Sequence, residues 1–321
     1  MKADGTIVAL AGGVGGARMA AGLAQCVAPG ALSVVVNTAD DFEHMGLAIS
    51  PDLDTVMYTL AGLENAAQGW GLAGETWSFM EATGRLGGET WFQLGDRDLA
   101  THVERTRRLA GGAPLSEVTT ALSVALGVTS HILPMSDDPV RTIIDTDIGR
   151  LAFQDYFVRR RCEPHLRAVA FEGAERARPL PAAITALADP RLAAIVLCPS
   201  NPYVSIAPLL AVQGLRQALE QRGVPLVAVS PIVGGKAVKG PAAKMMSELG
   251  VEATALGIAR HYRGLIDGLV IDEADRAVAD PLAALGMAVH VTDTIMRNGP
   301  TRRRLGEETL TFADQLALSR R

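Results

Sequence analysis

A glycine-rich turn near the start of the chain has the composition of a phosphate-binding loop. Residues 12–16 read Gly-Gly-Val-Gly-Gly, follow an apolar run and precede Arg18. Glycine lets backbone N–H groups approach a phosphate at the beginning of a helix, where the helix dipole favours negative charge. The alternative is a tight turn that only closes a strand onto its helix. The predicted phosphate-binding residues are Gly13, Gly15, Gly16 and Arg18.

The spacing of this turn argues against two common nucleotide sites. Gly13 and Gly15 are followed by Arg18 where the dinucleotide fingerprint has a third small residue. The Gly-Lys-Ser/Thr sequence of a P-loop is also missing from the turn. An ordinary NAD site and a P-loop NTPase are therefore both disfavoured.

Four aspartates, Asp40, Asp41, Asp52 and Asp54, follow the second predicted strand within a short span. Leu53 separates the last two, so an extended chain would point both carboxylates one way. Carboxylates repel a phosphate unless a cation lies between them, and Mg²⁺ prefers such hard oxygen ligands. Helix capping is the alternative use of these side chains. The predicted Mg²⁺ ligands are Asp41, Asp52 and Asp54.

Two later loops repeat one layout, in which polar residues follow an apolar strand. Ser200 and Asn201 follow the strand predicted at 193–198, and the segment 230–235 follows the strand predicted at 226–230. Ligands of open α/β sheets bind beyond the carboxyl ends of the strands. We therefore predict binding by both loops, with ordinary turn chemistry as the alternative.

A fifth segment, Leu-Gly-Asp-Arg-Asp-Leu-Ala-Thr-His at 94–102, combines charged and titratable side chains. Asp98 could cap a helix that carries His102 one turn further on. Arg97 could clamp a phosphate or stack on a planar ring. Taken alone, this pattern is also that of a capped surface helix.

The elements that must position these residues alternate between strand and helix, which predicts a Rossmann-like α/β fold with a mostly parallel sheet flanked by helices. One domain is expected over 1–321. Within it, residues 58–165 are expected to form an inserted subdomain, mainly helical with some β-hairpin structure, that contributes to the active site. A turn at 137–139 would join strands at 131–135 and 140–146. Further strands are predicted at 6–11, 32–37, 151–159, 269–272 and 288–292.

Composition excludes several classes of function. The chain has 321 residues and a formal net charge of −5, which does not suit a nucleic-acid partner. It has no uninterrupted apolar stretch long enough to cross a membrane and no secretory leader. Cys26, Cys162 and Cys198 lack metal-ligand spacing, so a reducing, cytoplasmic compartment is expected.

Longer motifs in the chain resemble those of the 2-phospho-L-lactate transferases, a family that acts in the biosynthesis of the deazaflavin coenzyme F-420. They cover nearly the whole chain in order, and ISPDLDTV with LPMSDDP forms the most specific pair. The motifs are the glycine turn, NTADD at 37–41, ISPDLDTV at 49–56, LGDRDLATH at 94–102, LPMSDDPVRT at 133–142, FQDYFVRR at 153–160, PSNPYVSI at 199–206 and VAVSPIVGGKAVKGPAAKMM at 227–246.

This resemblance implies a reaction and its partners. A guanosine diphospho-linked donor would transfer its phospho-acid unit to the terminal hydroxyl of the deazariboflavin Fo, and GMP would leave. Mg²⁺ and a homodimer are also implied. Asp54 and Arg97 match positions placed against the deazaflavin, and Asp41 and Asp54 are the predicted catalytic carboxylates. The predicted substrate-binding residues are Gly13, Gly15, Gly16, Arg18, Asn37, Thr55, Arg97, His102, Ser200, Asn201, Ser230, Gly234 and Gly235.

A non-catalytic protein that senses a nucleotide sugar is the main alternative, since distant relatives of similar fold do this. Such a protein would keep the glycine turn but would not need Asp52, Asp54 and the 94–102 segment together. Their presence favours the enzyme. The acid of the donor stays open between 2-phospholactate, phosphoenolpyruvate and phosphoglycerate.

Overall fold

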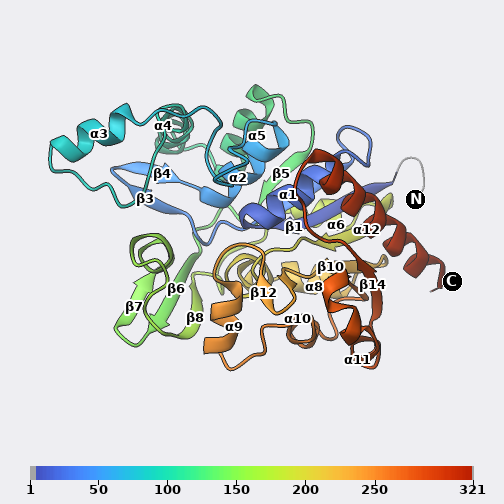
Figure 1. Ribbon diagram of the computed structural model, residues 1–321. Helices are drawn as coiled ribbons and strands as arrows, with labels where there is room; N and C mark the ends of the chain where they lie inside the picture. Colours follow the sequence, from blue (N-terminus) through green and yellow to red (C-terminus); the bar gives the residue numbers. More distant parts are fainter. Residues whose placement is uncertain (1–4, 320–321) are drawn as a thin grey trace.

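A seven-stranded parallel sheet lies at the centre of the computed structural model, which describes residues 5–319 (Figure 1). Its order is β14-β13-β10-β9-β1-β2-β5, so the direction of strand progression reverses between β1 and β9. Ligands of open α/β sheets bind at such a switch point. The strands are β1 (Thr6–Ala11), β2 (Leu32–Val36), β5 (His131–Pro134), β9 (Leu192–Leu197), β10 (Leu226–Val229), β13 (Gly268–Asp272) and β14 (Ala288–Thr292).

Alternate residues of the central strand β1 feed two separate cores. Ile7 and Ala9 pack with the helices of one face, and Val8 and Leu10 pack with those of the other. This period of two is expected of a strand that is buried on both faces. On the first face lie α1 (Gly13–Ala24), α2 (Pro51–Leu60) and α12 (Gly299–Ser319). On the second lie α6 (Pro181–Leu187), α7 (Ala207–Ala211), α8 (Leu215–Glu220) and α10 (Ala255–His261).

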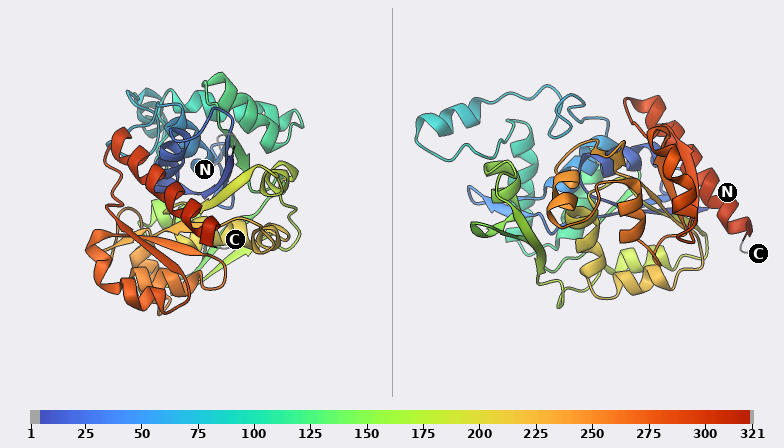
Figure 2. Two further views of the ribbon diagram at one scale, coloured as in Figure 1. Left: turned by 90° about the vertical axis from the view of Figure 1, so that its right-hand side faces the viewer. Right: turned by 60° about the horizontal axis from the view of Figure 1, so that its bottom comes forward.

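A mainly helical layer extends from one end of the sheet, and its outermost helix stands well away from the sheet (Figures 1 and 2). Ile49, Met80 and Leu94 form a small core of its own beneath this layer. The layer places the 94–102 segment over the carboxyl ends of the strands. Its elements are β3 (Phe42–His44), β4 (Leu47–Ile49), α3 (Ser78–Arg85), α4 (Asp98–Ala110) and α5 (Leu115–Ala125).

A second, antiparallel sheet has the order β7-β6-β8, from β6 (Arg141–Thr146), β7 (Gly149–Ala152) and β8 (Leu166–Glu172). The predicted hairpin between 131–135 and 140–146 is wrong, because β5 joins the parallel sheet beside β2. The hairpin instead joins β6 to β7. The strand predicted at 151–159 ends early, because the chain turns into the π-helix η1 (Asp155–Arg159).

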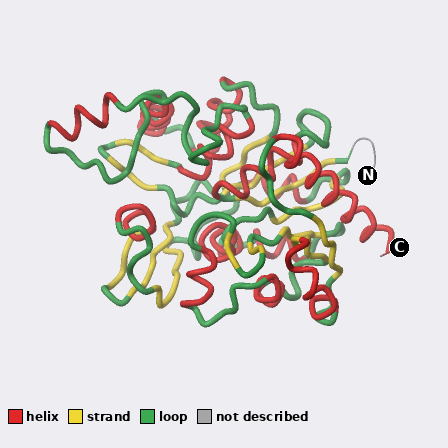
Figure 3. Tube along the Cα trace, viewed as in Figure 1, coloured by secondary structure: helices red, strands yellow, loops and turns green. Residues whose placement is uncertain are grey.

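The remaining elements are short helices and strands joined by loops (Figure 3). The helices α7 and α8 are separated by the extended residue Val212 and by Gly214, whose φ is 91°. The short elements not yet named are η2 (Pro202–Ile206), β11 (Ile232–Val233), β12 (Lys236–Ala237), α9 (Ala242–Glu248), η3 (Glu273–Val278) and α11 (Ala279–Ala283).

The predicted fold class, a Rossmann-like α/β fold with a mostly parallel sheet and a helical layer, is confirmed. The boundaries of a subdomain over 58–165 within one domain over 1–321 stay a prediction. Within residues 5–319, no helix is both long and apolar enough to span a bilayer.

The helices α1 and α12 cross at two glycines. A Cβ at Gly22 would overlap the carbonyl oxygen of Arg302, and a Cβ at Gly306 would lie 2.9 Å from the carbonyl carbon of Gly22. Both clashes involve backbone atoms, which cannot rotate away. The absence of side chains at these positions therefore sets the distance between the two helices.

We predict that Gly22→Ala lowers the free energy of unfolding by about 1–3 kcal/mol, because the added methyl group forces α12 off the core. Urea denaturation measures the change. Gly84→Ala is the matched control: it lies in α3, where a Cβ would meet only Thr90 Cγ2 at 3.5 Å. There the better helix former should leave stability equal or raise it by up to about 1 kcal/mol. Equal effects at the two positions would contradict the close-crossing interpretation.

Candidate active site

One cavity of about 640 Å³ lies at the carboxyl ends of the central strands. It extends from the glycine turn, past the aspartates and α4, to the loops after β9, β10 and β14. Most of the predicted site residues line it, although they come from widely separated parts of the sequence. Those that line it are Gly13, Gly15, Arg18, Asp52, Asp54, Thr55, His102, Ser200, Asn201 and Ser230.

The other predicted residues lie behind the cavity wall or away from it. Asn37 and Asp41 are buried beneath the wall. Arg97 is exposed and donates from Nη1 to the carbonyl of Ala73 at 2.9 Å, so it does not face the cavity. Gly234 and Gly235 form the exposed turn between β11 and β12, and Gly16 is covered by Ser200.

The glycine turn is shaped as much by protein contacts as by space for a ligand. A Cβ at Gly15 would overlap the carbonyl oxygen of Pro199, and one at Gly16 would lie 2.6 Å from Ser200 Oγ. Ser200 Oγ donates to the Gly12 carbonyl at 2.8 Å and accepts from the Gly12 N–H at 3.1 Å. Gly13 adopts φ 63°, in the left-handed region. Two of the glycines therefore permit the loop after β9 to pack directly on the turn.

Buried carboxylates surround Asn37 at the end of β2. The Asn37 amide donates to Asp40 Oδ2 and to Asp52 Oδ2, both at 3.0 Å, and Asp52 Oδ1 accepts the Gly13 N–H at 2.8 Å. Asp41 accepts from Ser50 Oγ at 2.7 Å. Oδ1 of Asp40 and Oδ1 of Asp41 are buried without a hydrogen bond to the described residues.

Burial shifts the titration of this group upward. It raises the pKa of Asp41 to about 8, and it raises that of Asp52 to about 6 against the opposing hydrogen bonds from Asn37 and Gly13. The pKa of Asp40 rises for the same reason and because Asp52 lies beside it. Three acidic groups that ionise reluctantly and retain unused oxygen lone pairs are the donor set that a hard divalent cation would satisfy.

Asp54 is not a free carboxylate. Arg105 from α4 pairs with both of its oxygens, through Nη2 to Oδ1 and through Nη1 to Oδ2 at 3.1 Å. Arg105 is only 2% exposed, so this is a buried, bidentate ion pair. The role of Asp54 as a metal ligand stays a prediction, and the Arg105 guanidinium already supplies the positive charge there.

A series of close polar contacts continues from this ion pair along α4. His102 Nδ1 lies 3.3 Å from Arg105 Nη1, and His102 Nε2 lies 3.2 Å from Asp98 Oδ2. Tyr58 donates its hydroxyl to Asp98 Oδ1 at 2.5 Å. Although burial opposes ionisation, the His102 and Tyr58 contacts lower the pKa of Asp98. Asp98 is thus an internal partner of His102 and not an exposed cap.

Ligand atoms of Asp54, Asp98 and His102 lie within 4.8 Å of one another, close enough for a metal ion. Arg105 contacts two of these three side chains. A cation there would face the guanidinium at short range. Asp40, Asp41 and Asp52 do not form such a close group among the described residues, so a metal ion bound by them stays a prediction.

Aromatic side chains form one part of the cavity wall. Phe153 and Phe157 stack with a centroid distance of 5.3 Å and an interplanar angle of 12°. Arg159 lies over the Trp91 ring at 5.0 Å. The lining also includes Trp70, which is 41% exposed. This wall could cover a planar ring system.

The side chains of Asn201 and Ser230 form hydrogen bonds within their own turns. Asn201 Oδ1 accepts from the Tyr203 N–H at 2.9 Å, and Ser230 Oγ donates to the Ile232 carbonyl at 2.9 Å. Their position on the cavity wall agrees with the prediction, but their side chains act mainly in turn formation.

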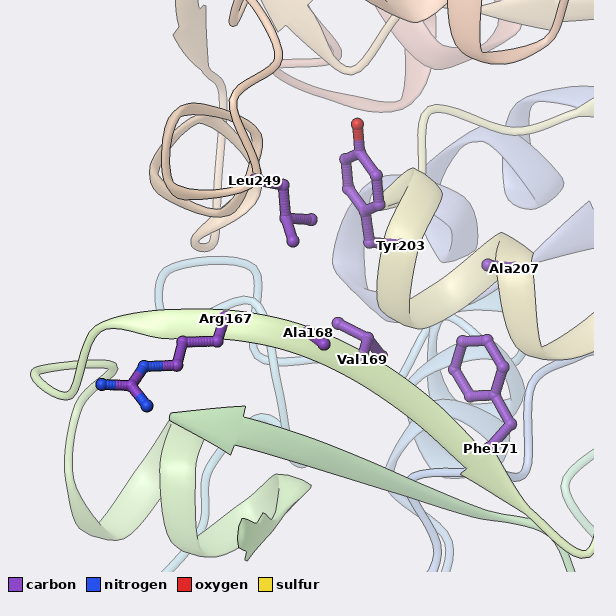
Figure 4. Close-up of a pocket in the computed structure, with 7 residues that line it drawn as sticks. All are labelled: Arg167, Ala168, Val169, Phe171, Tyr203, Ala207 and Leu249. Atoms are coloured by element: carbon purple, nitrogen blue, oxygen red, sulfur yellow. The ribbon is translucent and has the colours of Figure 1, made fainter. Parts of the chain in front are cut away.

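A second, smaller cavity of about 330 Å³ lies between β8 and η2 (Figure 4). Val169, Phe171 and Leu249 give it an apolar lining, and Arg167 points away from it. None of the predicted site residues lines this cavity.

Three residues of the main site escaped sequence-based assignment. The sequence motifs assign no role to Tyr58 or Arg105, and they predict Asp98 only as the cap of a helix. The spacing of Asp98, His102 and Arg105, at i, i+4 and i+7, places all three on one helix face. That spacing was the available signal.

Comparison with known proteins gives a consistent result. Residues 7–299 match the family model for 2-phospho-L-lactate transferase CofD. A phosphoenolpyruvate transferase of Streptomyces griseus is 42% identical over 316 residues, 97% of this chain and 99% of that protein. A 2-phospho-L-lactate transferase of Methanosarcina mazei is 38% identical over 301 residues, 94% of this chain and 98% of that protein.

The fold also matches a solved structure. A Bacillus halodurans protein of the UPF0052 family superposes with a TM-score of 0.60 at 16% identity, covering 97% of this chain and 99% of that one. At this level of identity the match shows the shared fold alone.

We predict that the metal-free protein becomes less stable as the pH rises from about 4 to about 8. Asp41 and Asp52 have folded-state pKa values of about 8 and about 6, above their ordinary value of 3.8, so the folded state binds more protons in this range. Its stabilisation is complete below the unfolded pKa and is lost as the pH passes the folded one. Urea denaturation with EDTA should show a loss of about 2 kcal/mol or more between pH 5 and pH 8.

Asp41→Asn is the control for that measurement, because it removes one titrating group and should flatten the profile. A free energy of unfolding that rises between pH 5 and pH 8 would contradict the assignment.

Proposed function

Because the chain belongs to the 2-phospho-L-lactate transferase CofD family, we propose that it transfers a phospho-acid unit from a guanosine diphospho-linked donor to the deazariboflavin Fo in the biosynthesis of coenzyme F-420. The acid of the donor is 2-phospholactate, phosphoenolpyruvate or a related compound. The proposal includes Mg²⁺ dependence and a cytoplasmic homodimer, both of which follow from the family resemblance.

The proposed reaction exchanges a phosphoanhydride bond for a phosphoester bond. The terminal ribityl hydroxyl of Fo attacks the phosphorus that carries the acid. A new P–O bond forms, the bond from that phosphorus to the bridging oxygen breaks, and GMP leaves with the electron pair. The hydroxyl proton passes to a base, and the product is a phosphodiester. Such transfer depends on in-line positioning and charge neutralisation more than on a covalent nucleophile.

One observation carries this proposal: a single cavity joins the glycine turn, the buried carboxylates and an aromatic wall. A diphosphate fits beside the glycine turn, where Arg18 contributes positive charge. The planar ring of Fo would lie against the aromatic part of the wall, which includes Trp91, Phe153 and Phe157. The reacting groups would then meet near Asp52 and Asp54, between the two parts.

The residues around Asn37 fit a bound Mg²⁺ ion. Asp40 and Asp52 line the cavity and share the Asn37 amide, and Asp41 lies directly behind them with a free oxygen. These are all oxygen ligands, the kind that Mg²⁺ prefers. When bound, the ion would neutralise diphosphate charge and lower the cost of ionising these carboxylates.

Asp54 is the carboxylate that we assign to the acceptor hydroxyl, because it lines the cavity whereas Asp41 does not. A carboxylate offers about four lone-pair positions, so Arg105 leaves room for one more hydrogen bond. Thr55, the next residue of α2, also lines the cavity. Arg105 holds Asp54 in a single orientation, which is the positioning that proton transfer requires.

We predict that the purified protein, supplied with Fo, Mg²⁺ and a panel of guanylylated phospho-acids, releases GMP with at least one donor. Chromatography quantifies GMP, and product mass identifies the acid. Asp54→Asn should lower the rate by about 10²-fold or more through loss of the base. Asp280→Asn, at an exposed position on α11, is the matched control and should keep full activity.

Circular dichroism and a melting curve must accompany Asp54→Asn, because Arg105 loses part of its partner. Absence of GMP with every donor, from folded protein, would refute the proposal. Tight binding of a nucleotide sugar without binding of Fo would support the non-catalytic alternative instead.

We predict opposite effects of Asp40→Asn on the metal-free and the Mg²⁺-loaded protein. Without metal, the variant should be at least as stable as the parent at pH 8, because it removes a buried charge that burial disfavours. With Mg²⁺, the parent should gain several degrees in melting temperature and the variant should gain little. Calorimetric scans with EDTA and with Mg²⁺ measure both. An undiminished Mg²⁺ response in Asp40→Asn would exclude Asp40 as a ligand.

A further inference from the structure

Residues 64–72, which we call the strap, form a compact loop between α2 and α3. Its two ends pair as an antiparallel bridge between Glu64 and Leu72. Inside it, Asn65 N–H donates to the Gly71 carbonyl at 3.0 Å, and Gly69 N–H donates to the Asn65 carbonyl at 2.7 Å. Glu64 also accepts from Arg302 Nη1 at 2.7 Å, which fixes this end of the strap to α12. The other hydrogen bonds are mostly internal, so residues 65–71 can shift without losing their own structure.

Two cations connect the strap to the cavity. Arg18 Nη2 donates to the carbonyl of Ala66, and Lys239 Nζ donates to the carbonyl of Gln68, both at 3.1 Å. Arg18 lies on α1, one turn beyond the glycines, and Lys239 lies in the loop before α9. Elements from opposite ends of the sequence therefore hold the strap at the same place.

These cations have no stronger partner in the described part of the chain. No carboxylate of residues 5–319 forms an ion pair with Arg18 or Lys239. Both line the main cavity, together with Gly13 and Gly15 of the glycine turn. Burial lowers the pKa of Lys239 and the charge of Arg18 lowers it further, so the two cations disfavour each other. An anion between them would remove this repulsion.

We propose that Arg18 and Lys239 form a two-cation anion site that the strap carbonyls of Ala66 and Gln68 occupy in this structure and that the oxyanions of the donor take over on binding. The cations then act as a latch: they hold either the strap or the donor. This inference rests on the proposed function for the identity of its anion, and it adds Lys239 and the strap to the residues that recognise it.

Energetics favour the exchange. A neutral carbonyl on a cation is replaced by a charged phosphate oxygen, so an ion–dipole contact becomes an attraction between opposite charges. The released carbonyls of Ala66 and Gln68 lie on exposed residues, where water can satisfy them. The strap therefore gives up its contacts at small cost.

Release of the strap would also change the aromatic part of the cavity wall. Trp70 lies on the strap, lines the cavity and is partly exposed. Its ring packs edge-to-face near Trp77, with a centroid distance of 6.2 Å. Movement of the strap would therefore move an aromatic side chain of the wall proposed for the acceptor ring, so the donor would bind first and shape the acceptor site.

Inorganic pyrophosphate is the probe for the first test, measured by calorimetric titration of the full-length protein with EDTA present. Lys239→Met should weaken its binding about tenfold, because one charge-assisted hydrogen bond is lost. Lys239→Arg should recover most of the affinity. Lys236→Met is the matched control, an exposed lysine three residues away on β12 that does not line the cavity, and it should bind as the parent does.

Gly69→Ala provides the sharper test, because it should change affinity in the opposite direction. Gly69 has φ 84°, and a Cβ there would lie 3.2 Å from Val14 Cγ1 and would overlap Lys239 Nζ. The substitution loosens the strap and keeps both cations. If the strap competes with the anion, pyrophosphate should bind several-fold more tightly to Gly69→Ala than to the parent protein.

Hydrogen exchange of the strap amides gives the third measurement. Pyrophosphate should speed exchange over residues 64–72 in the parent, and Lys239→Met should show fast exchange before any ligand is added. Slower exchange on binding, or weaker binding by Gly69→Ala, would overturn the latch. None of these readouts requires turnover, so failure of the GMP assay and failure of the latch are separate results.

Discussion

The site depends on the side-chain amide of Asn37, which has fewer N–H bonds than hydrogen-bond acceptors around it. Asn37 Nδ2 lies within hydrogen-bonding distance of Asp40, Asp52 and the Val204 carbonyl, yet an amide carries only two N–H bonds. The contacts join the end of β2, the beginning of α2 and η2 at one point. A cation such as the proposed Mg²⁺ would satisfy the remaining carboxylate oxygens. The protein thus brings buried carboxylates together at a cost that a bound cation would offset.

Much of the architecture was predictable because the strands of a parallel sheet are buried on both faces. Continuous apolar runs such as 6–11 and 193–198 therefore lie within one residue of the observed strands β1 and β9. The polar residues that follow such runs must meet at one edge, and Ser200 does contact Gly12 across a separation of 188 residues. The cavity could be located from that rule alone.

Sequence could not show which carboxylates would remain free. Asp52 and Asp54 look equivalent in the sequence, but α2 turns them toward different partners, Gly13 and Arg105. The second partner comes from a helix 51 residues away, a distance that no local pattern reports. The position of the Arg97 side chain could not be predicted for a related reason. It donates to the Ala73 carbonyl and does not line the cavity. Turn residues were also misleading, since the 137–139 turn leads into a different sheet and not into a hairpin.

The close crossing of α1 and α12 bears on how the domain should be delimited. The family match ends at residue 299, where α12 begins. Yet Leu305, Leu310 and Phe312 complete the apolar core over one face of the sheet. A recombinant fragment trimmed to the matched stretch would leave part of that face uncovered, with side chains of β9, β10 and β13 open to water. The last helix belongs to the folding unit although it contributes nothing to the cavity wall.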